Sequence, residues 1–282
     1  NKDLDISKTI GGGHFRINLH YQRGVLGLTA RLISDVIPSP ESIGLNKQLQ
    51  RLAFLNDGFV LVVGPCGSGK STTLASLLGI INRERQGKII TIEDPIEYIF
   101  ENDHCLIEQR EIGIDANDFA VALKYVLRQD PNVIMVGEMR DNETIDAALT
   151  AAETGHLVFS TLHTGPAAES LSRIVSSFPA YQQGQIATKL SLCLRAVISQ
   201  RLLPAASGGR VAAREIMFNT PAIANLLRSQ KPEQISSIIQ TSSRDGMITL
   251  NRSIEELLAS GQITPEVAKM YTRGDSGDSY WR

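Results

Sequence analysis

The residues from Gly64 to Ser71 constrain this chain more than any others. They read Gly-Pro-Cys-Gly-Ser-Gly-Lys-Ser and fit the phosphate-binding pattern G-x-x-x-x-G-K-[ST], with Thr72 next in the chain. An unbroken apolar run over residues 59–63 precedes them, as expected of a strand buried on both faces. Apolar residues at helical spacing follow over residues 72–81. A strand, a glycine-rich loop and a helix in this order are the context in which the pattern binds nucleotide phosphates.

The chemistry of this loop follows from its residue types. Its glycines let the backbone curl so that successive N–H groups point at one anion, and the following helix adds its positive N-terminal end. We expect Lys70 to bind the β- and γ-phosphates of ATP and the Ser71 hydroxyl to ligate Mg²⁺. A glycine-rich turn without a ligand is the alternative, which the flanking strand and helix disfavour. The predicted nucleotide-binding residues are Gly64, Pro65, Cys66, Gly67, Ser68, Gly69, Lys70, Ser71 and Thr72.

Composition places the chain among ordinary globular proteins and narrows the classes of function. The chain has 282 residues, of which 42% are hydrophobic and 21% charged, and its net charge is −2. This balance gives no support to nucleic-acid binding, for which a basic excess is typical. No apolar stretch reaches the ~18 residues that span a membrane, and neither a signal peptide nor a C-x-x-C pair is evident. We therefore expect a cytoplasmic protein.

The N-terminal part of the chain differs in pattern from the rest. Residues 1–37 alternate polar and apolar residues between glycine turns, which predicts antiparallel strands. We interpret them as the remnant of a small α+β domain whose earlier part is missing. Residues 38–40 (Pro-Ser-Pro) mark a linker, and a helix that includes residues 45–53 is expected next, with Ser39 or Ser42 as its cap.

Residues 41–282 alternate strand-like and helix-like segments, which predicts a parallel sheet with helices on both faces. Strands are expected at 59–63, 88–92, 132–136 and 157–161, and helices at 72–81, 119–127, 142–154 and 186–197. A hairpin over 202–216 and a mainly helical subregion over about 220–274 should follow, with helices at 221–228, 232–240, 250–259 and 265–271. Residues 274–282 are polar and glycine-rich, and we expect them to be loose.

Polar residues follow the predicted strands at the points where the strands end. Residues 93–97 (Glu-Asp-Pro-Ile-Glu) and 138–141 (Glu-Met-Arg-Asp) follow two strands, and His163 ends a third. Because the carboxyl ends of parallel strands share one crevice, we expect these groups to lie beside the phosphate-binding loop. His156 precedes its strand and is expected at the opposite end. Taken singly, each group has an ordinary alternative, namely a turn, a surface ion pair or a polar cap.

Taken together, these segments resemble a known family. Residues 64–72, 91–97, 136–141 and 151–164 are similar, in this order, to the Walker A motif, the Asp box, the atypical Walker B motif and the His box of the secretion ATPase superfamily. Its members are hexameric motors of type IV pili, type II secretion and type IV secretion. The resemblance covers nearly the whole chain.

Within this superfamily the chain most resembles the retraction ATPases of twitching motility. Assembly and type II secretion ATPases usually carry a tetracysteine zinc loop, which this sequence lacks. Residues 220–229 resemble the retraction family's Ala-Ile-Arg-Asn-Leu-Ile-Arg-Glu motif. Ala224 stands where that motif has its first Arg, and Ser229 stands where it has its Glu. This departure concerns the retraction role and leaves the ATPase assignment untouched.

The resemblance implies a fold and a role for several residues. The implied fold is α/β: a RecA-like P-loop ATPase domain with a parallel-rich sheet and a helical C-terminal part, behind a partial α+β domain of PAS-like type. Glu97 should be the general base on the attacking water, Glu138 should act on Mg²⁺ through water, and His163 should contact the γ-phosphate. The family's arginine fingers come from the segment before the motor domain, and the candidates here are Arg16, Arg31 and Arg23.

The resemblance also implies an assembly and a task. Six copies should form a homo-hexameric ring that hydrolyses Mg-ATP, turns an inner-membrane platform protein and drives type IV pilus retraction. Such a motor would be cytoplasmic and peripheral to the membrane, at the cytoplasmic face of the bacterial inner membrane, with no nucleic acid as partner.

Three alternatives stay open. A sister motor for pilus assembly or for type II or type IV secretion would use the same chemistry on another partner. A RecA-type DNA or RNA motor is disfavoured by the net charge of −2. A nucleotide-gated scaffold that does not hydrolyse ATP is disfavoured by the presence of Lys70, Glu97, Glu138 and His163.

Overall fold

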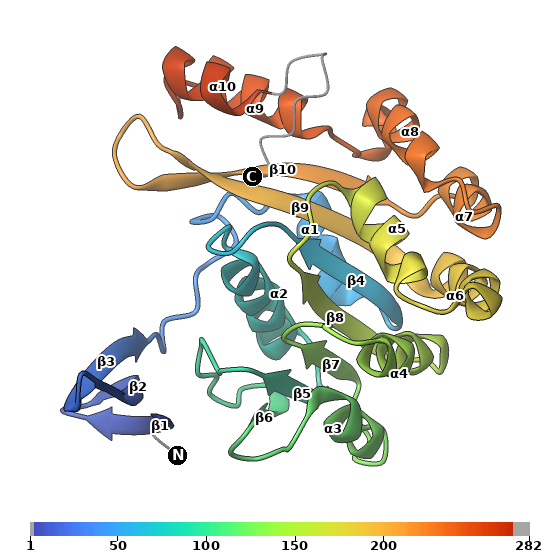
Figure 1. Cartoon of the computed structure of the whole chain (residues 1–282). Helices are drawn as coiled ribbons and strands as arrows, with labels where there is room; N and C mark the ends of the chain where they lie inside the picture. The colour runs from blue at the N-terminus through green and yellow to red at the C-terminus, as the bar shows by residue number, and fades with distance from the viewer. Residues whose placement is uncertain (1–2, 273–282) are drawn as a thin grey trace.

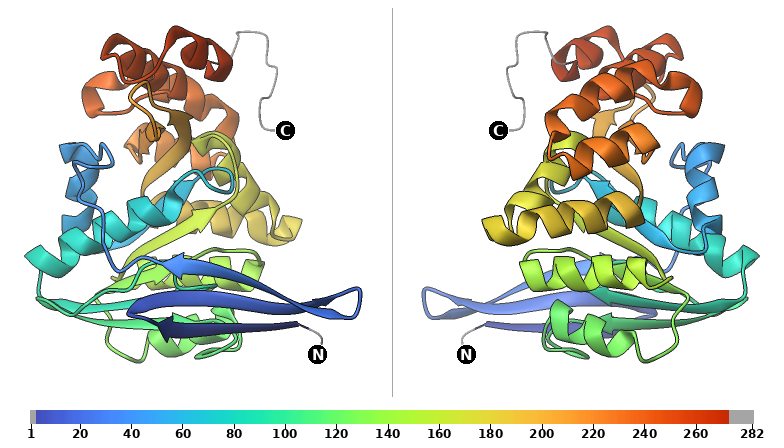
Figure 2. Two further views of the ribbon diagram at one scale, coloured as in Figure 1. Left: turned by 90° about the vertical axis from the view of Figure 1, so that its left-hand side faces the viewer. Right: turned by 90° about the vertical axis from the view of Figure 1, so that its right-hand side faces the viewer.

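Residues 3–272, which this computed structural model describes, form two sheets joined by a linker (Figure 1). The predicted loose tail at 274–282, and with it the end of the predicted motor domain, lies outside the described residues. The smaller sheet lies on the side of the larger one where strands β5 (Gly87–Glu93) and β6 (Cys105–Glu111) are, as Figures 1 and 2 show. Of the helices within residues 3–272, none combines the length and the apolar character that crossing a bilayer would need.

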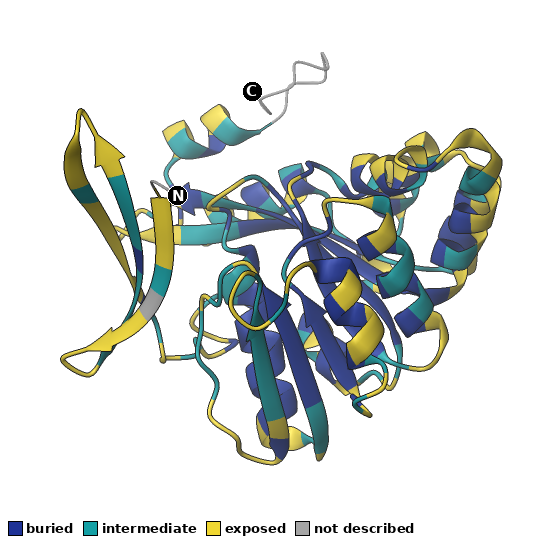
Figure 3. Ribbon diagram, turned by 60° about the horizontal axis from the view of Figure 1, so that its bottom comes forward, coloured by how far each residue is buried: buried dark blue, intermediate teal, exposed yellow. Residues whose placement is uncertain are grey.

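The N-terminal sheet is an antiparallel meander with two different faces. Its strands are β1 (Asp3–Ile10), β2 (Gly13–Gln22) and β3 (Val25–Ile33). Side chains alternate along a strand, so the cross-strand partners Arg16 and Arg31 share one face, whereas Leu4, Leu19 and Leu28 share the other. Leu4 and Leu28 are more than half exposed, and Figure 3 shows how much of this sheet is open to solvent. The predicted strands are confirmed, and the PAS-like assignment stays a prediction.

The larger sheet has seven strands in the order β10-β9-β4-β8-β7-β5-β6. All neighbours among the described strands pair in parallel except β9 and β10, which form the predicted antiparallel hairpin. The central strand β4 is therefore held by β8 on one side and β9 on the other. The strands are β4 (Gly58–Val63), β5 (Gly87–Glu93), β6 (Cys105–Glu111), β7 (Val133–Val136), β8 (Leu157–Leu162), β9 (Leu194–Pro204) and β10 (Arg210–Phe218).

Helices cover both faces of this sheet because its strands are apolar on both faces. Side chains alternate between the two faces along a strand. Phe59 and Leu61 of β4 therefore pack into one core, and Val60 packs into the other. The first core is closed by α3 (Phe119–Val126), α4 (Asn142–Glu153), α5 (Ala167–Ser176), α6 (Ala180–Cys193), α7 (Pro221–Arg228) and α8 (Ile235–Thr241). The second is closed by α1 (Lys47–Gln50), a 3₁₀ turn (Arg51–Phe54) and α2 (Lys70–Glu84). A third, smaller core joins α9 (Leu250–Ala259) and α10 (Pro265–Tyr271) to the β9–β10 hairpin. The doubly covered α/β fold predicted from the sequence is confirmed.

Three sequence-based expectations about secondary structure are wrong. The helix expected at 186–197 ends at Cys193, and the chain continues as β9, because pairing with β4 overrides the local pattern. The helix after the linker begins at Lys47 and is capped by Asn46. Ser39 instead accepts a hydrogen bond from the Ser42 N–H in a turn. Two elements, β6 and α5, were not expected from the sequence; β6 is a half-polar edge strand with little apolar alternation.

Candidate nucleotide-binding site

The glycine-rich loop joins the end of β4 to the start of α2, as its pattern predicts. Gly64, Gly67 and Gly69 have φ angles of 148°, 73° and 86°, a region that residues with a Cβ rarely adopt. At Gly64 an added Cβ would lie 2.4 Å from the carbonyl oxygen of Gln200 and 2.6 Å from the Ser68 hydroxyl oxygen. The loop can therefore keep this curvature only with glycine at that position.

Lys70 lies across the mouth of the loop. Its side chain is buried, and its Nζ donates hydrogen bonds to the carbonyl oxygens of Gly64 (2.9 Å) and Pro65 (3.0 Å). Nζ also lies 3.4 Å from Nδ1 of His163. Burial lowers the pKa of Lys70, and the nearby acidic groups partly oppose this effect. The ammonium group is thus held against the carbonyl oxygens at the start of the loop.

Gln200 on β9 fixes the loop from the neighbouring strand. Its Nε2 donates to the carbonyl oxygen of Ser68 (2.7 Å), and its Oε1 accepts from the Thr73 hydroxyl (2.9 Å). The side chain is 1% exposed. No motif in the sequence marks this residue. A lone glutamine beside an apolar run is the signal that could have found it, since a buried amide needs hydrogen-bond partners.

The acidic and basic groups that follow β7 and β8 meet opposite Lys70. The Glu138 carboxylate is 2.5 Å from Nη2 of Arg140 and 3.6 Å from Nε2 of His163. Arg140 also reaches the Asp94 carboxylate, at 3.8 Å. Burial, then the charge of Lys70, lowers the pKa of His163, which favours the uncharged ring at neutral pH. The crevice expected at the carboxyl ends of the strands is therefore present.

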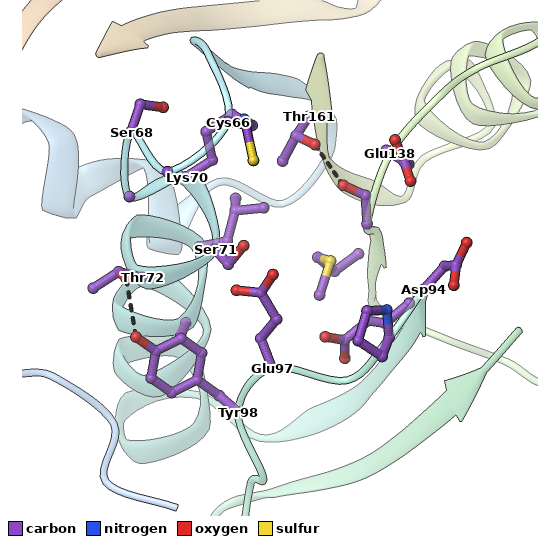
Figure 4. A pocket seen from close by; sticks show the side chains of 18 of the residues that line it. Cys66, Ser68, Lys70, Ser71, Thr72, Asp94, Glu97, Tyr98, Glu138 and Thr161 are labelled. Carbon is purple, nitrogen blue, oxygen red and sulfur yellow. Dashed lines mark hydrogen bonds between the residues drawn. The ribbon is translucent and has the colours of Figure 1, made fainter. Parts of the chain in front are cut away.

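Glu97 projects from the loop after β5 into the same space. Figure 4 shows its exposed carboxylate pointing toward Ser71. The next residue, Tyr98, has its hydroxyl 2.9 Å from that of Thr72, which joins this loop to α2. The cavity between these elements has a volume of about 520 Å³. Among the residues that line it are Cys66, Gly67, Ser68, Gly69, Lys70, Ser71, Thr72, Glu97, Glu138 and His163.

The three candidate arginine fingers do not lie equally close to this cavity. Arg31 lines it. Arg16 and Arg31 line a smaller neighbouring cavity of about 170 Å³ together with Glu97. Arg23 sits in the turn between β2 and β3 and is not among the residues that line either cavity. Arg210 at the start of β10 also lines the larger cavity and was missed, because hairpin pairing alone brings it there. His156 lies before β8, at the end of the strand away from the loop, as expected.

Glu93 is an almost fully buried acid under this site. It accepts hydrogen bonds from the Thr91 hydroxyl (2.6 Å) and from Nε2 of Gln109 (3.2 Å). Burial nevertheless raises its pKa from 4.5 to about 7. At neutral pH a substantial fraction of the molecules therefore carries a protonated Glu93.

This shift makes stability depend on pH in a defined direction. Between pH 4.5 and about 7 the unfolded chain has released the Glu93 proton while the folded chain still holds it, so the free energy of unfolding falls as pH rises. At about 1.4 kcal/mol per pH unit, the contribution of Glu93 totals roughly 3 kcal/mol. Glu93→Gln should remove this pH-dependent contribution. The melting temperature of the variant minus that of wild type should therefore increase from pH 5 to pH 8. If the melting temperatures of the two proteins change by the same amount over this pH range, the raised pKa of Glu93 is contradicted.

Comparisons with known proteins agree with this geometry. Residues 42–244 match the family described as type II/IV secretion system protein. The chain is 48% identical over 268 residues to the type IV pilus retraction ATPase PilT of Pseudomonas aeruginosa, which spans 95% of this chain and 78% of that protein. It is 44% identical over 282 residues to a twitching motility protein of Neisseria gonorrhoeae (99% and 75%). Its fold matches the crystal structure of the pilus retraction motor PilT with bound ADP, with a TM-score of 0.91, 45% identity and coverage of 98% and 79%.

Proposed function

Because this chain belongs to the type II/IV secretion system protein family, we propose that it is an ATPase that powers type IV pilus retraction. One observation carries the proposal. The phosphate-binding loop, Glu97, Glu138 and His163 line a single cavity in a fold that matches a retraction motor with bound ADP. Similarity to a twitching motility protein along nearly the whole chain supports the same task.

The residues around the cavity suit a nucleoside triphosphate with Mg²⁺. The loop offers backbone N–H groups and Lys70 to the phosphates. The Ser71 hydroxyl and, through water, the Glu138 carboxylate would hold Mg²⁺, and both line the cavity with oxygen atoms of the kind that this ion prefers. When bound, the ion neutralises charge on the β- and γ-phosphates.

The side chains then divide the hydrolysis between them. Glu97 orients the attacking water and accepts its proton as the bond from the water oxygen to the γ-phosphorus forms. The bond between that phosphorus and the β,γ-bridging oxygen breaks in the same displacement, and ADP leaves with the bond's electron pair. Lys70 and His163 contact the γ-phosphate, and Lys70 stabilises the charge that develops on it. Arg31, with Arg16 behind it, acts as the arginine finger, since both lie on the face of the N-terminal sheet that adjoins Glu97. Arg23 lies in the turn between β2 and β3 and lines neither cavity.

We extend the proposal to the assembly and its partner. Six copies form a ring, and ATP binding and hydrolysis move the N-terminal sheet against the motor domain about a hinge near residues 38–40. The ring acts at the cytoplasmic face of the inner membrane, on a platform protein of the pilus machinery. The support for this step is the family membership and the position of the N-terminal sheet beside the cavity.

Deleting the gene tests the direction of the motor. A retraction motor is expected to leave cells with more surface pili than wild type and with no twitching. Wild-type protein supplied from a plasmid should restore twitching, and the Glu97→Gln variant should not. Cells that lose their pili would indicate an assembly motor, and cells that twitch normally but fail to secrete would indicate a secretion motor. Either result would contradict the proposal.

A further inference from the structure

Glu97 lies on a loop whose position is set by side chains. Residues 94–104 connect the parallel neighbours β5 and β6 without a helix. Within this loop only Tyr98 forms a strand-like bridge, to Ser34, the residue directly after β3. A loop without a regular ladder must satisfy its backbone groups elsewhere. The place of the Glu97 carboxylate therefore depends on which groups hold the backbone on either side of it.

Gln109 of β6 holds the loop after Glu97. Its Oε1 accepts a hydrogen bond from the Phe100 N–H (2.9 Å), and its Nε2 donates to the Tyr98 carbonyl oxygen (2.8 Å). The same Nε2 donates to the Glu93 carboxylate (3.2 Å). Gln109 is half-buried. Its amide oxygen binds the loop, and its amide nitrogen binds both the loop and Glu93, the residue directly before the loop.

Two acids hold the loop before and at Glu97. The Glu111 carboxylate accepts a hydrogen bond from the Ile96 N–H (3.2 Å). The Glu93 carboxylate accepts one from the backbone of Glu97 itself. Gln109 therefore joins the Glu93 carboxylate to the part of the loop beyond Glu97.

We propose that Gln109 is a positioning residue for ATP hydrolysis: it fixes the loop that carries Glu97, so that this carboxylate meets the attacking water. The inference rests on the proposed function, in which Glu97 is the general base. Gln109 does not line the nucleotide cavity, so its loss should leave nucleotide affinity nearly unchanged. Catalysis is more sensitive, since a displacement of about 1 Å at a reacting group can cost 100-fold in rate.

The test compares turnover with nucleotide binding in the full-length protein. Gln109→Met keeps the length of the side chain and removes every hydrogen bond it makes. We expect kcat for ATP to fall about 10- to 100-fold, while the Kd of a fluorescent ADP analogue changes less than about twofold. The control is Glu108→Gln on the same strand, where the side chain points to the other face and pairs with Lys88 (2.8 Å). Its kcat and Kd should both stay within about twofold of wild type.

A second variant keeps the proposal testable if Gln109→Met does not fold. Gln109→Glu retains the acceptor for Phe100 but cannot donate to Tyr98 when ionised, and kcat should again fall at least about tenfold. Wild-type turnover in either folded variant, or a loss of ADP affinity as large as the loss of kcat, would overturn the proposal. Glu97→Gln separates the two levels of inference. If that variant is inactive and the Gln109 variants are fully active, only the positioning role fails; if it hydrolyses ATP normally, the proposed base fails as well.

Discussion

Replacing Glu97 with glutamine is expected to slow ATP turnover about a thousandfold while nucleotide affinity stays nearly constant. Glutamine has the same length and cannot accept the proton of the attacking water. The exposed carboxylate points toward Ser71 in the cavity (Figure 4), but it belongs to the loop after β5 and not to the loop that supplies N–H groups and Lys70 to the phosphates, so binding should survive the change. Single-turnover hydrolysis and equilibrium binding of a fluorescent ADP analogue measure the two effects separately.

The matched control is Glu101→Gln, which changes an exposed acid on the same loop. Its turnover should remain within about twofold of wild type, since its side chain does not line the cavity. The oligomeric state should be recorded on the same samples, so that a lost assembly is not mistaken for a lost base. Normal turnover by Glu97→Gln would show that another group activates the water.

Replacing Lys70 with alanine is expected to weaken binding of ATP and ADP at least about a hundredfold. The change removes a cation that is buried at the centre of the loop and would make charge-assisted hydrogen bonds to phosphate oxygens. Two such bonds at about 1.5–3 kcal/mol each correspond to a hundredfold or more in Kd. It also removes the hydrogen bonds to the carbonyl oxygens of Gly64 and Pro65, which help to hold the loop.

Isothermal titration with ADP is the direct measurement for this variant. Lys124→Ala, which removes an exposed lysine from α3, should bind ADP as wild type does. A loss of affinity in both variants would point to a general effect of net charge. Unchanged affinity in Lys70→Ala would mean that the loop binds phosphate through its backbone alone.

Features set by neighbouring residues could be predicted from the sequence. The helices expected at 221–228, 250–259 and 265–271 coincide with α7, α9 and α10. Each is preceded by a threonine whose side chain accepts a hydrogen bond from the helix backbone, a signal contained in three or four residues. The phosphate-binding loop is local in the same sense. The alternation of strands and helices indicated a parallel sheet, and hence the common edge where Glu138 and His163 meet.

Features set by residues far apart in the chain could not be predicted in this way. Gln200 holds a carbonyl group 132 positions earlier in the sequence, and no local pattern encodes that pairing. Gln109 likewise became visible only when the course of the loop before it was known. The choice among the arginines depended on register: Arg31 pairs with Arg16 across two strands, whereas Arg23 lies in the turn that joins them.

The two faces of the N-terminal sheet also limit how this part of the chain can change in evolution. One inserted or deleted residue within Gly13–Gln22 or Val25–Ile33 would reverse the face of every side chain beyond it in that strand. It would place apolar side chains (Phe15 or Ile17, and Ala30 or Leu32) where Arg16 and Arg31 now adjoin Glu97, and charged groups on the apolar face. Related sequences should therefore differ in length here by pairs of residues, or at the glycine turns, where the alternation starts anew.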